Sequence, residues 1–127
     1  MMKAINISLL IVILGITLNS CYKDNEEELY PLATQCDTLN VTYEGKIKTI
    51  ISDYCIACHG SSNFTSLGGG IELEGYVKLK AKVDDGSFLS SVTHDGNVSF
   101  MPKNSGKLSD CNLAIIKKWI DEGALEK

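Results

Sequence analysis

The chain has 127 residues and a formal net charge of −4, and all 12 of its basic residues are lysine. This length fits one ordinary domain. An acidic chain without arginine offers no basic stripe to neutralise phosphates, which excludes nucleic acid as an expected partner and favours proteins with positive patches.

Residues 1–20 predict an export signal, with a positive start followed by an apolar run too short for a membrane span. The run ends at Leu18-Asn19-Ser20-Cys21, which resembles a bacterial lipobox. That resemblance implies cleavage before Cys21 and a lipid on its sulfur; the alternative is an ordinary secretory signal followed by a chance cysteine. We therefore expect an exported, membrane-anchored lipoprotein that faces the periplasm or the cell surface.

Residues 21–35 are polar and acidic and lack any apolar period, which predicts a flexible tether between the lipid and the domain. The acidic run just after Cys21 resembles a signal that sends some lipoproteins to the cell surface, although a solvated spacer explains it equally well. The folded domain is expected at residues 36–127.

The first predicted helix covers residues 43–54, because its apolar residues recur at helical spacing and Thr42 can cap it. It leads directly into a cysteine motif. Near the other end, Ser109 can cap a second amphipathic helix that stops at Gly123. The apolar face of that second helix is formed by Leu113, Ile116, Trp119 and Ile120.

Between these helices, residues 76–83 and 87–92 predict two short helices joined by a turn at Asp85-Gly86. No pair of segments alternates in the way that strands require. The fold class is therefore all-α with long loops. So small a helical core is unusual unless another group supplies part of its apolar volume.

The motif that carries chemistry is Cys55-Ile56-Ala57-Cys58-His59, which has the Cys-x-x-Cys-His pattern of covalent haem c attachment. Its two thiols bond the porphyrin vinyl groups, and His59 supplies the proximal iron ligand. A zinc site would need further ligands, for which Cys36 and Cys111 are the natural candidates. A thioredoxin-like redox pair would follow a strand, whereas this motif follows a predicted helix. We expect one covalent haem c.

The haem motif uses two of the five cysteines, and the other three can then be assigned. With Cys21 lipidated and Cys55 and Cys58 attached to haem, Cys36 and Cys111 are left over. An oxidising compartment would pair them as a disulfide. The alternative is two unrelated buried thiols.

The sixth iron ligand is expected from Met101, which is the only methionine that remains after removal of residues 1–20. A lone methionine in a polar loop has little packing role, although it could plug the haem edge. His94 is the rival ligand, because it is the only other histidine. Its turn more ordinarily holds an exposed histidine or one bonded to a haem propionate.

These motifs occur in an order that resembles class I c-type cytochromes, most closely the small planctomycete-type cytochrome c domain. The resemblance runs from about Val41 to Ala124, and its markers are Ile50 to Gly60, Gly69 to Leu73, Met101-Pro102 and Lys107 to Ala124. It implies crossing terminal helices around one haem and His59 and Met101 as axial ligands. It also implies close approach of the backbone to the haem in the stretch from Gly68 through Gly69 to Gly70. Cys111 departs from the family pattern.

The resemblance to class I cytochromes implies an electron carrier, not an enzyme, that serves redox partner proteins. The lipobox implies that a lipid at Cys21 holds it at a membrane. One alternative is a haem-bearing subunit or electron-entry module of a larger redox enzyme. Another is a haem-based gas or redox sensor. A peroxidase is disfavoured, because the chain has no arginine to form a distal acid–base pair with histidine.

Overall fold

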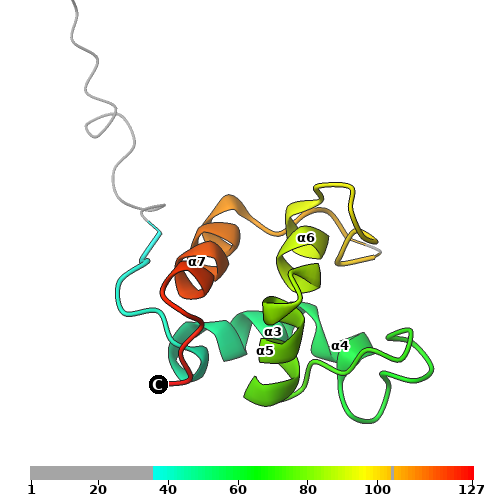
Figure 1. Ribbon diagram of the computed structural model, residues 1–127. Coiled ribbons are helices and arrows are strands. Elements are labelled where there is room, and N and C mark those ends of the chain that lie inside the picture. The colour runs from blue at the N-terminus through cyan, green and yellow to red at the C-terminus, as the bar shows by residue number, and fades with distance from the viewer. Residues whose placement is uncertain (1–35, 104) are drawn as a thin grey trace, which may run out of the picture. The chain divides into compact units, whose positions relative to one another are not determined.

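The computed structural model describes residues 36–103 and 105–127 (Figure 1). The predicted export signal at 1–20, its Cys21 and the tether at 21–35 lie outside this part of the chain. The described residues form helices joined by loops and contain no strand, as the sequence predicted. None of these helices has the length and apolar character that crossing a membrane requires.

The first helical segment consists of a π-helical turn, η1 (Tyr43–Ile47), followed by α3 (Lys48–Tyr54). The predicted cap is present, since Thr42 Oγ1 accepts a hydrogen bond from Gly45 N at 3.1 Å. The predicted helix over 43–54 is thus confirmed in extent. Its first turn differs from an α-helix, because the Lys48 amide donates a hydrogen bond to Tyr43 O, five residues back.

A break at Cys55 separates α3 from the short helix α4 (Ile56–His59). Residues 60–75 then form a long loop before α5 (Tyr76–Asp84), and α6 (Ser87–Thr93) follows after the predicted turn. Gly86 adopts φ +77° in that turn, a left-handed conformation that suits glycine. Both short helices lie within one residue of their predicted bounds.

The last helix, α7 (Asp110–Asp121), is capped as predicted, with Asn112 N donating to Ser109 Oγ at 3.2 Å. It ends just before Gly123, which has φ +92°. The predicted apolar face is buried at Leu113, Ile116 and Trp119, while Ile120 lies at its margin.

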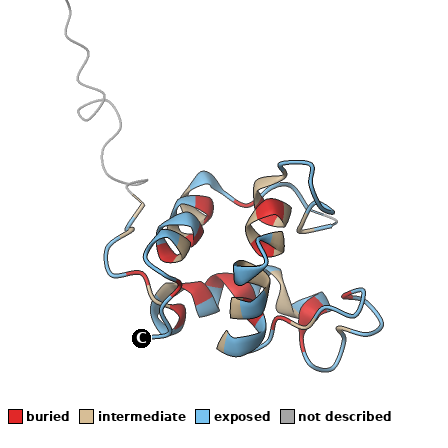
Figure 2. Ribbon diagram, viewed as in Figure 1, coloured by how far each residue is buried: buried red, intermediate tan, exposed pale blue. Residues whose placement is uncertain are grey.

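The core forms where these helices meet, and their buried faces point toward one another (Figure 2). Its fully buried side chains come from η1, α3, α5 and α7: Ile47, Ile51, Leu79, Ile116 and Trp119. Because η1 contacts α7, the two terminal helical segments pack together. Leu125 O reinforces this contact by accepting hydrogen bonds from Tyr43 N and Trp119 Nε1.

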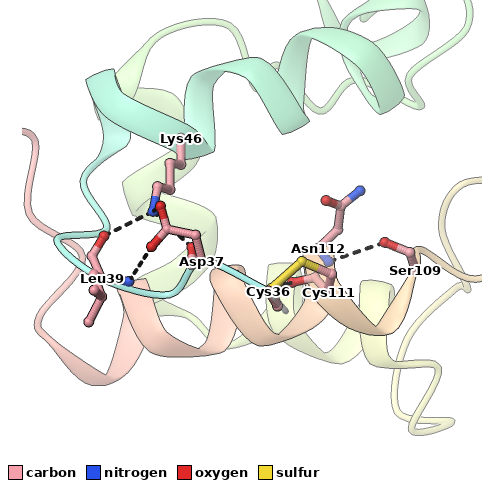
Figure 3. The surroundings of a disulfide bond; sticks show 7 residues. All are labelled: Cys36, Asp37, Leu39, Lys46, Ser109, Cys111 and Asn112. Atoms are coloured by element: carbon pink, nitrogen blue, oxygen red, sulfur yellow. Dashed lines mark hydrogen bonds and ion pairs between the residues drawn. A yellow bond between two sulfur atoms is a disulfide. The ribbon is translucent and has the colours of Figure 1, made fainter. Parts of the chain in front are cut away.

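Residues 36–42 are held against this core at two points (Figure 3). Cys36 and Cys111 lie at disulfide distance, with their Cα atoms 5.2 Å apart, which joins the start of the described chain to the first turn of α7. Lys46 forms an ion pair with Asp37 and donates to Leu39 O at 2.9 Å. The pairing predicted from the cysteine count therefore agrees with the geometry.

Candidate functional site

A cavity of about 1000 Å³ opens between α4, the loop at 60–75, the corner between α5 and α6, and the segment before α7. This volume lies at the upper end of the range for small-molecule and cofactor sites. Much of its wall is apolar: Leu67, Ile71, Leu73, Phe88, Val92, Val98, Pro102 and Leu108. The sequence does not indicate these residues as site residues, because the apolar wall of a pocket carries no motif.

The two thiols of the Cys-x-x-Cys pair line this cavity. Cys55 is half-buried and Cys58 exposed, and both are free cysteines, so they are not bonded to each other. Burial raises the pKa of the Cys55 thiol to about 11. Thioredoxin-like pairs rely on a cysteine whose pKa is lowered, so this environment argues against that alternative.

His59 also lines the cavity and is 8% exposed. Its Nδ1 lies 2.8 Å from Ile71 O, and its own carbonyl accepts a hydrogen bond from Leu73 N at 2.9 Å. A carbonyl oxygen can only accept, so Nδ1 carries the hydrogen, which leaves Nε2 as the nitrogen that could bind a metal. A backbone carbonyl bonded to the second ring nitrogen is the usual support of a metal-binding histidine.

Three consecutive glycines follow in the loop, and the first of them lies against this histidine. A Cβ on Gly68 would lie 2.9 Å from His59 Nδ1 and 2.7 Å from Cys58 O, so only glycine fits there without a shift. Gly69 and Gly70 have φ values of +61° and +80°, which glycine adopts without strain. Gly69 lines the cavity, whereas Gly70 is not among the lining residues. The tight contact with the cysteine motif thus falls at Gly68, the first glycine of the predicted stretch.

Met101 reaches the same cavity from the segment that follows α6. Its side chain is partly buried, and its amide donates to Ser91 O at 3.0 Å. The fold therefore brings together all four predicted haem-binding side chains, although the chain separates Met101 widely from the cysteine motif.

His94, the rival iron ligand, is not among the residues that line the cavity. Its Nε2 lies 2.8 Å from Met101 O, and its ring stacks on Phe100 with centroids 4.7 Å apart. Since Met101 lines the cavity and His94 does not, and His94 Nε2 is engaged by a carbonyl, the geometry favours Met101 over His94.

The cavity wall is charged at the corner between α5 and α6. Lys82 Nζ donates to Asp85 Oδ2 at 2.9 Å, and Ser87 bonds the same carboxylate through both its amide and its hydroxyl. The Ser87 hydroxyl, then Lys82, lower the pKa of Asp85 to about 2. This cluster keeps a carboxylate and an ammonium at the edge of a mainly apolar cavity.

The zinc alternative lacks its ligands. Cys36 and Cys111, the cysteines that such a site would recruit, are paired with each other away from the cavity. Across residues 36–103 and 105–127, no three or more histidine, cysteine or acidic side chains gather in a way that could hold a metal ion.

Comparison of the chain with protein-family models, curated proteins and solved structures gave no match.

Proposed function

We propose that residues 36–127 bind one covalently attached haem c and act as an electron carrier of the class I cytochrome c type. The observation that carries this proposal is the set of donors on one cavity: two free thiols, a supported imidazole and a thioether. Such a set would hold a haem, with two thiols for its vinyl groups and two side chains that can bind iron.

Each residue has a defined role in this proposal. Cys55 and Cys58 form thioethers with the two vinyl groups, and His59 binds the iron through Nε2. Met101 provides the sixth ligand. When bound, the haem would supply a centre that accepts and releases one electron at a time.

The protein's contribution is to orient these ligands and limit the access of water. The Ile71 carbonyl holds the His59 ring, and the apolar wall lowers the local polarity. Histidine and methionine ligands together with burial raise the reduction potential and keep the iron environment similar in both oxidation states. Electron transfer without substrate turnover then needs only an exposed haem edge and a weak partner contact.

We further propose that the chain is exported and held at a membrane by a lipid on Cys21. The net charge of −4 favours redox partner proteins with basic patches. Tethering would raise the effective concentration of membrane-bound donors and acceptors, because encounters become confined to the same surface.

A redox titration of the purified full-length protein, followed by visible absorbance, tests the electron-carrier function. We expect one reversible one-electron transition, little binding of carbon monoxide to the ferrous form, and no turnover of hydrogen peroxide. Rapid carbon monoxide binding by the native protein would contradict a closed site and favour a gas sensor. Steady peroxide turnover would favour an enzyme instead.

A further inference from the structure

The loop that carries Met101 is fastened to the end of α6. Met101 N donates to Ser91 O at 3.0 Å, and Met101 O lies 2.8 Å from His94 Nε2. Both polar groups of the Met101 backbone are thus bonded to residues at the C-terminal end of α6. The direction of its side chain depends on these two bonds, because they define the plane of the adjoining peptide groups.

The second bond requires a particular state of His94. Since the Met101 carbonyl can only accept, the His94 Nε2 must carry a hydrogen. The ring is held flat against Phe100, at an interplanar angle of 15°. His94 also has φ +58°, a left-handed conformation that glycine adopts readily and that asparagine, aspartate and histidine adopt more often than other residues.

The turn after His94 is bonded separately. Asp95 accepts hydrogen bonds from Ser90 Oγ and from Asn97 N, the latter at 2.9 Å. These bonds hold the turn without touching Met101. His94 is therefore the side chain that links the turn to the Met101 backbone.

We propose that His94 is a positioning residue that keeps the Met101 sulfur directed into the cavity, and so keeps the sixth iron position closed. This inference rests on the proposed haem site. It gives the second histidine of the chain a role other than that of an iron ligand. Loss of the His94 bond should let the Met101 segment swing outward more often while the haem stays attached through Cys55 and Cys58.

The test measures how tightly imidazole binds the ferric full-length protein, because imidazole can bind only where Met101 has left the iron. The apparent Kd falls in proportion as the open fraction rises. For His94→Gly, which removes the ring and tolerates the left-handed backbone, we expect an apparent Kd roughly tenfold lower than in the native protein. His94→Asn keeps an amide donor, so its apparent Kd for imidazole should lie between those of His94→Gly and the native protein.

Two comparisons separate positioning from a general structural effect. Asn40→Gly makes a matched change at another left-handed residue, with φ +49°, which does not line the cavity, and should leave the Kd unchanged. In a Met101→Ala background, His94→Gly should have no further effect, because the group that it positions is absent. Covalent haem content should be equal in all variants.

An unchanged Kd in His94→Gly, or an equal change in the Met101→Ala background, would overturn the positioning role. Native protein that carries no covalent haem would instead overturn the proposed function, and the inference with it. If Met101→Ala binds imidazole no better than the native protein while His94→Gly binds it far better, then His94 is itself the iron ligand, which also contradicts the inference.

Discussion

Gly68 and His59 show how the site depends on single residues. The cysteine motif alone indicated His59 as a ligand, since the residue type and spacing are both in the sequence. The support of its ring by Ile71 O and the close fit of Gly68 could not be predicted. They arise from the path of a loop that returns to the motif and has no periodic pattern of its own.

Replacing Gly68 by alanine should therefore disturb the histidine directly. The new methyl group would meet His59 Nδ1 and Cys58 O at less than 3.0 Å, so the loop must shift. We expect a loss of about 1–3 kcal/mol in the free energy of unfolding, measured by urea denaturation, together with lower haem incorporation. Gly106→Ala is the matched control, because nothing lies within 4 Å of its added Cβ. Equal stability of the two variants would refute the tight fit.

Met101→Ala tests the sixth ligand. Removing the thioether should open the iron, so the ferrous variant should bind carbon monoxide on the order of a hundredfold more tightly than the native protein. Carbon monoxide titration followed by absorbance measures this change. Ser99→Ala, at another residue that lines the cavity, should behave like the native protein. If the absorption spectrum of Met101→Ala were unchanged, Met101 would not be the sixth ligand, and His94 would become the candidate.

At the scale of elements, the four predicted helical segments are present near their predicted bounds, because apolar periodicity and capping residues act locally. The π-helical form of η1 and the path of residues 60–75 were not predicted. Both depend on which partners the backbone finds in the folded domain. The same holds for the polar cluster between α5 and α6, of which the sequence indicated only the Asp85-Gly86 turn.

That cluster leads to a prediction on pH. The Ser87 hydroxyl and Lys82 hold the pKa of Asp85 at about 2, below its ordinary value of 3.8. Stability from the charged form is therefore complete above about pH 4 and is lost as the pH falls through about 2. Carbon NMR of the side-chain carboxyl groups should show this midpoint directly. Ser87→Ala should raise it, whereas Ser62→Ala, at an exposed serine of the loop, should not. A normal midpoint in the native protein would contradict the hydrogen-bonded arrangement.

At the scale of the whole molecule, the Cys36–Cys111 pair spans 75 residues, and the loop that it closes contains η1 and α3 to α6 but only the start of α7. Closing so long a loop restricts the unfolded chain, which by the chain-entropy model is worth about 4 kcal/mol.

Replacing both cysteines by alanine should lower the free energy of unfolding by up to this amount, measured by urea denaturation. Addition of a reductant should affect the native protein in the same way and leave the double variant unchanged. The visible spectrum should stay the same, because neither cysteine lines the cavity. A double variant as stable as the native protein would show that the pair is not bonded.

Covalent attachment of haem at Cys55 and Cys58 is tested most directly by a mass spectrum of the denatured protein. The full-length chain would be produced in a host that attaches haem to exported proteins. We predict the mass of the processed chain with its lipid and one haem that denaturation does not remove, and loss of that haem when both cysteines are replaced by alanine. A protein without haem, whose Cys55 and Cys58 both react with an alkylating agent, would contradict the account.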